Sequence, residues 1–187
     1  MSILDTFVTI DLETTGLSPK DSEILEIGAV KVESGKVLKR FQTYIKPISG
    51  IPDEVVRLTG ITNDHVKEAP KAKSALDRLR EFVGELPLIA FQGRFEERFL
   101  TAHSLFPVEN AIHGVRDLAR AALPCLGDHS APGLAKRFGS ESTSPHRALR
   151  DAEGLAATYL GTVEALRDLS LQLKQQMLQL LQGTDSS

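Results

Sequence analysis

Residues 7–12 read Phe7-Val8-Thr9-Ile10-Asp11-Leu12, an alternating run rich in β-branched side chains. Such a run is typical of a β-strand, and the segment from Thr14 through Gly16 to Ser18-Pro19 supplies the residues that end one. We expect this strand to be the central one. Because side chains two residues apart on a strand leave the same face, Asp11 and Glu13 are predicted to lie side by side.

The rest of the chain predicts two more strands and then an alternation of strands and helices. The runs 23–32 and 37–45 alternate, and a polar segment containing Gly35 joins them, which predicts a hairpin. Short strands are predicted within 86–91 and 112–115. Helical spacing and end signals predict helices over 52–60, 70–83, 94–105, 118–123, 134–138 and 147–160. This order predicts an α/β fold with a mixed five-stranded sheet flanked by helices.

Composition limits the class of protein. The chain has 187 residues, of which 41% are hydrophobic, so one compact domain is the expectation. The lone Cys125 cannot form an internal disulfide, no Cys/His cluster offers a zinc site, and the N-terminus lacks a secretory pattern, so we expect a cytoplasmic protein. No apolar run approaches the roughly 18 residues of a membrane span. The net charge of −3 argues against coating nucleic acid by bulk positive charge, but it is compatible with a metal nuclease.

Two groups of residues carry candidate chemistry. Asp11 and Glu13 form an oxygen-rich pair of the kind that Mg²⁺ or Mn²⁺ prefers, because adjacent carboxylates repel each other unless a cation or a proton lies between them. The second group is His146 and Asp151. If a helix begins near Arg147, Asp151 lies in its second turn and His146 just before it, so both can serve one site. A neutral histidine can take a proton from a metal-bound water.

In this order, the two groups resemble the DEDDh, or DnaQ-like, family of 3′-to-5′ exonucleases, which includes polymerase proofreading subunits, RNase T and oligoribonuclease. The first motif is Asp11-Leu12-Glu13-Thr14-Thr15-Gly16-Leu17, followed by Glu26-Ile27-Gly28-Ala29-Val30. Segment 51–61 resembles the connecting segment of the family, and His146 with Asp151 matches the third motif. The resemblance covers roughly residues 5–160 and implies a ribonuclease-H-like fold.

The second motif departs from the family pattern. The family usually has His-Asn-Ala-x-Phe-Asp, whereas this chain has Phe91-Gln92-Gly93-Arg94-Phe95-Glu96. Glu96 therefore stands where the family has a metal-ligating Asp, and Gln92 stands where it has Asn. Each exchange lengthens a side chain by one methylene, although Mg²⁺ demands near-ideal geometry at about 2.0–2.1 Å. We expect a locally expanded pocket. Glu97 is an alternative ligand that would require a shift in helix register.

The resemblance implies a mechanism and its residues. Two ions, Mg²⁺ or Mn²⁺, would be held by Asp11, Glu13, Glu96 and Asp151, with His146 as the general base. The product would be a nucleoside 5′-monophosphate cut from the 3′ end of single-stranded DNA or RNA. The substrate-binding residues implied are Thr14, Thr15, Gly16, Leu17 and Gln92, and the candidates for phosphate contact are Arg94, Arg147 and Arg150. The alternative is a weakened or inactive subunit that binds nucleic acid or acts as a scaffold with the same fold.

The C-terminal segment leaves its role open. We expect residues 1–162 to form the exonuclease domain and residues 163–187 to form a final helix with a frayed end. Its apolar residues recur at near-heptad spacing, and Ser170 interrupts them. Such a helix either packs on the domain or serves self-association or binding to a partner such as a polymerase.

Overall fold

The computed structural model of the chain describes residues 4–103, 110–140 and 146–168, together with residues 173, 175 and 178. Among these residues, five strands form one sheet in the order β3-β2-β1-β4-β5. The strands are β1 (Thr6–Thr14), β2 (Ile24–Glu33), β3 (Lys36–Tyr44), β4 (Leu88–Ala90) and β5 (Ile112–Gly114). The predicted five-stranded sheet is confirmed, with β1 at its centre.

The sheet is mixed. β1 pairs antiparallel with β2, and β2 pairs antiparallel with β3 through a turn in which Ser34 and Gly35 both have positive φ, 49° and 74°. Two successive positive φ angles match the twist of a hairpin, which explains why the turn contains a glycine. β1 pairs parallel with β4, and β4 with β5. The carboxyl ends of β1, β4 and β5 therefore meet at one edge of the sheet.

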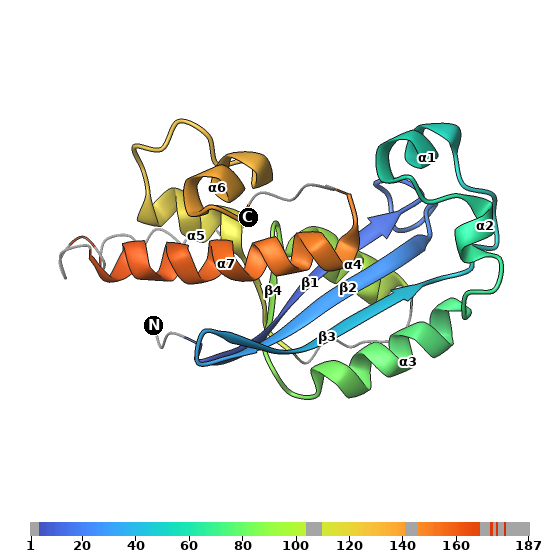
Figure 1. Cartoon of the computed structure of the whole chain (residues 1–187), viewed down its shortest axis with the longest axis horizontal. Helices are drawn as coiled ribbons and strands as arrows, with labels where there is room; N and C mark the ends of the chain where they lie inside the picture. The colour runs from blue at the N-terminus through green and yellow to red at the C-terminus, as the bar shows by residue number, and fades with distance from the viewer. Residues whose placement is uncertain are drawn as a thin grey trace.

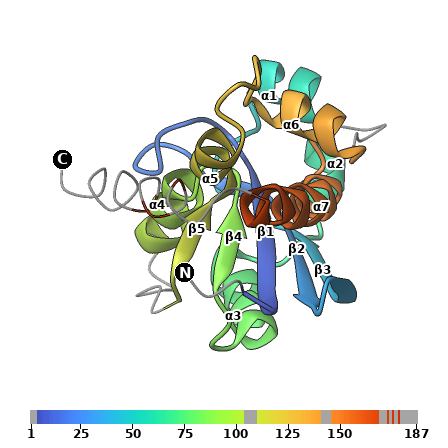
Figure 2. The same cartoon turned by 90° about the vertical axis from the view of Figure 1, so that its left-hand side faces the viewer.

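Helices cover both faces of the sheet. The helix α3 runs beneath one face and α7 crosses the other, as Figures 1 and 2 show from two directions. The helices are α1 (Asp53–Thr59), α2 (Asn63–Val66), α3 (Ala72–Val83), α4 (Arg94–Ala102), α5 (Val115–Ala122), α6 (Ala131–Phe138) and α7 (Ala148–Arg167).

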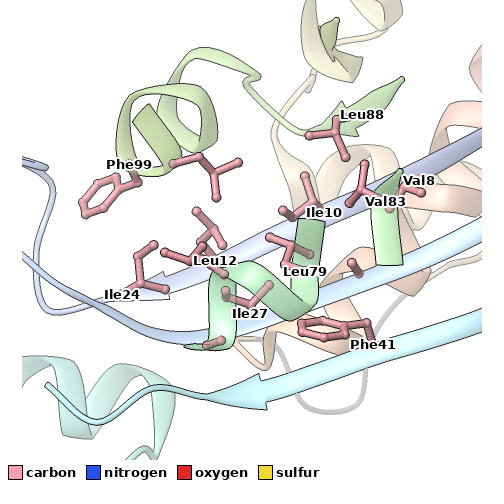
Figure 3. Packing of buried hydrophobic residues seen from close by; sticks show 14 of the residues in the cluster. Val8, Ile10, Leu12, Ile24, Ile27, Phe41, Leu79, Val83, Leu88 and Phe99 are labelled. Carbon is pink, nitrogen blue, oxygen red and sulfur yellow. The ribbon is translucent and has the colours of Figure 1, made fainter. Parts of the chain in front are cut away.

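The alternation of β1 divides its side chains between two cores. Val8, Ile10 and Leu12 belong to the core under α3 and α4, where Figure 3 shows Leu79 and Val83 beside them. Phe7 belongs to the core under α5 and α7 and contacts Tyr159 edge to face. Side chains at odd positions of β1 therefore point toward α7.

Four helical features differ from the sequence prediction. α5 begins at Val115 rather than 118. α2 was not expected, and α6 begins at Ala131 rather than 134, because the Ser130 side chain accepts a hydrogen bond from the Gly133 N–H and caps the helix. α7 continues without a break past position 162 to Arg167, and Val163 is buried in the core beneath it. Most of the expected C-terminal helix lies outside the described residues. Within the described part of the chain, no helix is long and apolar enough to cross a membrane.

Candidate active site

A cavity of about 530 Å³ opens at the carboxyl end of β1, and Asp11, Glu96, His146 and Asp151 all line it. The four residues come from β1, α4, the segment before α7, and α7 itself. Parallel pairing of β1 with β4 explains why Asp11 and Glu96 come together, because α4 starts just after β4, at the same edge of the sheet where β1 ends. The structure thus brings together residues that are up to 140 positions apart in the sequence.

Three carboxylates form the centre of the site. Asp11, Glu13 and Asp151 each place an oxygen atom within 4.8 Å of the others. Asp11 and Glu13 share the α7-facing side of β1, and Thr9 on that side donates a hydrogen bond of 2.7 Å to the Ala152 carbonyl. This contact fixes α7 on the strand next to Asp151. Sets of hard carboxylate oxygens such as this one suit Mg²⁺ or Mn²⁺.

The electrostatics of the site favour a cation. Burial, and then the negative charge of Glu13, Glu96, Asp151 and Glu26, raise the pKa of Asp11 well above its ordinary value. Burial and the charges of Asp151 and Glu26 likewise raise the pKa of Glu13 to about 7, although Arg147 lowers it in part. Carboxylates this close cannot all ionise cheaply unless a positive charge lies among them. The acid cluster is therefore the arrangement expected of a metal site.

His146 and Asp151 are tied to each other. The His146 backbone N–H donates to Asp151 Oδ2 at 2.9 Å, and the Asp151 N–H donates to the Arg147 carbonyl at 3.0 Å. His146 is exposed at the cavity and has a φ of 61°, a left-handed conformation that non-glycine residues rarely adopt. Strained backbone of this kind clusters at functional sites. Burial raises the pKa of Asp151, and the hydrogen bonds from the backbone of His146 and Arg147 partly offset that shift.

Glu96 lies in the first turn of α4 and is only 4% exposed. Burial raises its pKa to about 7, which backbone interactions at Glu96 and Gly93 partly oppose. Its Oε2 atom is buried and has no hydrogen-bond partner among the described residues. Its carboxylate contributes to the raised pKa of Asp11, but it is not part of the cluster within 4.8 Å. A buried oxygen without a partner, next to three acids, fits a residue that completes a cation site. Glu97 is exposed.

The loop after β1 borders the cavity. Leu17 lines the cavity and is 85% exposed, so it presents an apolar side chain to whatever enters. The Thr15 N–H donates to the Glu23 carbonyl at 2.8 Å, and the Thr15 hydroxyl accepts from the Glu23 N–H at 2.9 Å. Thr15 therefore shapes the loop with both groups. The Thr14 hydroxyl donates to the Gly16 carbonyl at 2.6 Å. On the opposite side, Gln92 lines the cavity and is exposed.

The three arginines expected near phosphate lie in different places. Arg150 lines the cavity and is exposed, whereas Arg94 begins α4 and is also exposed. Arg147 is different, because its guanidinium donates to Glu26 at 3.3 Å and to the Tyr44 hydroxyl at 2.6 Å. Its donors are directed into the protein. The structure therefore corrects the prediction of a phosphate contact for Arg147.

Glu26 is the residue whose part in the site the sequence did not reveal. In the sequence, Glu26 belongs to the segment that follows the first motif. In the structure it lies opposite Glu13 in the sheet, and its carboxylate faces the start of α7. A charged residue in the apolar first half of β2, 121 positions before its arginine partner, was the available signal. Only the fold shows which partner it meets.

A family model for exonuclease domains, RNase_T, matches residues 8–159 of the chain. The chain belongs to the DEDDh exonuclease family. This match spans both acid motifs and the Glu96 segment between them. The ribonuclease-H-like fold expected from the sequence is thereby confirmed.

Solved structures share the fold of this chain, and a curated relative is similar to it in sequence. The solved complex of exonuclease X with 5′-overhanging duplex DNA superposes with a TM-score of 0.71 at 23% identity, covering 91% of this chain and 99% of that one. The nuclease domain of 3′hExo, a DEDDh member bound to rAMP, gives a TM-score of 0.76 at 20% identity, covering 87% and 94%. DNA polymerase III PolC-type from Staphylococcus haemolyticus is 30% identical over 185 residues, which is 97% of this chain but only 13% of that protein.

Proposed function

We propose that this DEDDh protein is a 3′-to-5′ exonuclease that hydrolyses the terminal phosphodiester bond of single-stranded DNA or RNA and releases nucleoside 5′-monophosphates. The observation that carries the proposal is the acid cluster of Asp11, Glu13 and Asp151, of which Asp11 and Asp151 line one cavity together with His146. Membership in an exonuclease family supports the reaction class.

The residues fit a pair of divalent cations. Asp11, Glu13, Glu96 and Asp151 would hold two Mg²⁺ or Mn²⁺ ions, because all four offer hard oxygen donors and Glu96 Oε2 is buried without a hydrogen-bond partner in the described part of the chain. When bound, such ions neutralise charge on the phosphate and favour an in-line displacement. The raised pKa values of Asp11 and Glu13 support a bound cation, because a positive charge nearby would favour the ionised forms of these acids.

The remaining roles belong to the protein. His146 would accept the proton of the attacking water, since it lines the cavity and its backbone N–H is hydrogen-bonded to Asp151. Leu17 would pack against the terminal base, because a sequence-independent nuclease binds single strands largely by apolar contact with bases. The loop from Thr14 to Gly16 and the side chain of Gln92 would border the terminal nucleotide, and Arg150 would contact phosphate.

A 3′ end could reach this site from a polymerase or as a free strand. Similarity to a PolC-type polymerase supports a proofreading context and a DNA substrate.

The experiment that tests the proposal uses 3′-labelled DNA and RNA of the same sequence, each with Mg²⁺ and with Mn²⁺. We expect metal-dependent release of labelled mononucleotide, and its absence after Asp11→Ala. Folded protein that releases nothing at any metal concentration would exclude the proposal.

The second candidate is a subunit that binds nucleic acid without cutting it. The position of Glu96 outside the 4.8 Å cluster favours this alternative, because a fourth acid that did not reach a shared ion would leave the cation site incomplete. It predicts oligonucleotide binding that needs no metal and that Asp151→Asn leaves unchanged. Binding that depends on metal and weakens in Asp151→Asn would exclude it.

A further inference from the structure

Glu26 is a fully buried acid that the mechanism above does not use. It is 0% exposed on β2, and its carboxylate accepts hydrogen bonds from Gln42 Nε2 at 2.6 Å and from the Ala148 backbone N–H at 3.3 Å. Arg147 donates to both of its oxygens, from Nε and Nη2, each at 3.3 Å. A buried charge is tolerated only when it is paired and hydrogen-bonded, so this environment holds Glu26 in one place.

Arg147 is held from a second side. Its Nη2 donates to the Tyr44 hydroxyl at 2.6 Å, and its guanidinium carbon lies 5.7 Å from the centre of the Tyr44 ring. Arg147 is also the N-cap residue of α7, where its own side chain makes no cap hydrogen bond. The N-cap residue of α7 is therefore connected to β2 through Glu26 and to β3 through Tyr44.

The contact with Ala148 replaces a helix cap. The first N–H groups of a helix have no partner within the helix, and Glu26 accepts one of them from outside. Beside it, Gly28 lets the α7 backbone rest directly on β2, since a Cβ atom there would lie 2.1 Å from the Ala148 carbonyl carbon. Glu26 and Gly28 of β2 thus fix how closely the first turn of α7 approaches the sheet and the direction in which the helix starts.

Two site residues depend on that turn. His146 precedes Arg147 by one residue, and Asp151 follows Ala148 by three. The hydrogen bond from the His146 N–H to Asp151 Oδ2 joins them across the turn. Any shift of Arg147 or Ala148 moves the imidazole and the carboxylate together relative to Asp11 and Glu13.

We propose that Glu26 is a positioning residue that acts through Arg147 and Ala148 to set the places of His146 and Asp151. The proposal rests on the proposed function for its kinetic readout. A purely stabilising role for the same ion pair makes a different prediction, because it would change the melting temperature without changing the rate of the folded protein.

The test compares two substitutions in the full chain. Glu26→Gln keeps the size and the acceptor oxygen but removes the charge. The matched control is Arg40→Gln, which breaks the Arg40–Glu153 ion pair, another link between the sheet and α7 that lies away from the cavity. Steady-state kinetics on an oligonucleotide would be measured below the melting temperature of each variant, with folding checked by circular dichroism.

We expect kcat of Glu26→Gln to fall about 10- to 100-fold with KM unchanged, the size of effect that a displacement of about 1 Å can cause. Arg40→Gln should keep the wild-type kcat. Equal kcat values for wild type and Glu26→Gln would overturn the proposal. If Glu26→Gln does not fold, Arg147→Lys replaces it, since it keeps the positive charge and loses the two-pronged contact, and the same fall in kcat is expected.

A second measurement separates this proposal from the proposed function. If the wild-type protein releases no nucleotide, the proposed function fails, and amide hydrogen exchange of residues 146–151 then decides the positioning. Faster exchange in Glu26→Gln than in Arg40→Gln supports the role of Glu26. Identical exchange in the two variants overturns it.

Discussion

The starts of α4 and α7 both deliver an acid to the same cavity, but the protein holds them differently. At α7, Asp151 accepts a hydrogen bond from the His146 backbone, and Glu26 accepts one from Ala148. At α4, Glu96 keeps a buried oxygen that accepts no hydrogen bond from the described residues. Asp151 is thus held by a hydrogen bond within the protein, whereas the buried oxygen of Glu96 needs a partner that enters the site.

The backbone at α4 is nevertheless well placed. Gly93, the residue before α4, has a φ of 75° and approaches Gly114 so closely that a Cβ atom would lie 3.2 Å from the Gly114 nitrogen. The backbone at the start of α4 is therefore fixed, and only the carboxylate end of the longer Glu96 side chain is free of this constraint. This difference shows that replacement of the family's Asp by Glu96 in this chain confines the least constrained part of the site to a single carboxylate.

The largest effect should come from Asp11, which lies between the two helix starts. Asp11→Asn keeps the size of the side chain and removes the charge on which the cluster is centred. We expect release of mononucleotide to fall by about 10²–10³-fold or more, the range for loss of a group that stabilises charge in the transition state. The measurement is the initial rate on a 3′-labelled strand. An unchanged rate would show that the acids at the starts of α4 and α7 do not act with Asp11 in catalysis.

The next effect tests the α4 side alone. Glu96→Asp restores the family's residue but draws the carboxylate back from a cluster that it already lies outside. We expect activity to fall about 10- to 100-fold, since small displacements at a site have effects of this size. Glu97→Asp, which changes the exposed neighbour, is the control and should leave the rate unchanged. A faster enzyme after Glu96→Asp would mean that the longer side chain is a defect.

A smaller effect is expected on the α7 side when its contact with β2 is disturbed. Gly28→Ala introduces a Cβ atom against the α7 backbone, so the helix must move. We expect the free energy of unfolding to fall by about 1–3 kcal/mol, as in overpacked cores. Urea denaturation measures this change. Gly50→Ala, where nothing lies within 4 Å, is the control, and equal losses in the two variants would contradict a tight contact.

The smallest effect concerns pH and metal. The pKa values of Glu13 and Glu96 are raised from 4.5 to about 7 in the folded protein, so without metal the folded state binds more protons than the unfolded state between those values. Stability from these groups is therefore complete at low pH and declines as pH rises through about 7.

We expect the melting temperature of metal-free protein to fall between about pH 5 and pH 8, and Mn²⁺ to raise it more at the higher pH. Differential scanning calorimetry with and without chelator measures both. A melting temperature that metal raises equally at both pH values would contradict the account of these acids.

Much of the fold followed from local patterns. Alternation predicted β1, β2 and β3, and Gly35 predicted the turn between two of them. The same alternation put Asp11 and Glu13 on one face of β1, because two-residue spacing is a local property. The spacing of His146 and Asp151 around a helix start was local as well.

What the sequence did not reveal depends on contacts between distant segments. Glu26 meets Arg147 across 121 positions, and no local pattern shows that Arg147 points into the protein instead of toward phosphate. The early start of α6 depends on the Ser130 cap, which the run of Gly and Pro around it concealed. The orphaned oxygen of Glu96 likewise appears only when α4 is packed against β1.

Counting bound Mn²⁺ ions tests most directly whether Glu96 completes the acid cluster. Wild type and Glu96→Gln would be titrated with Mn²⁺ in the presence of a nucleoside 5′-monophosphate, and bound metal would be measured by electron paramagnetic resonance. We predict two ions for the wild type and one for Glu96→Gln. Two ions of unchanged affinity in Glu96→Gln would contradict the account.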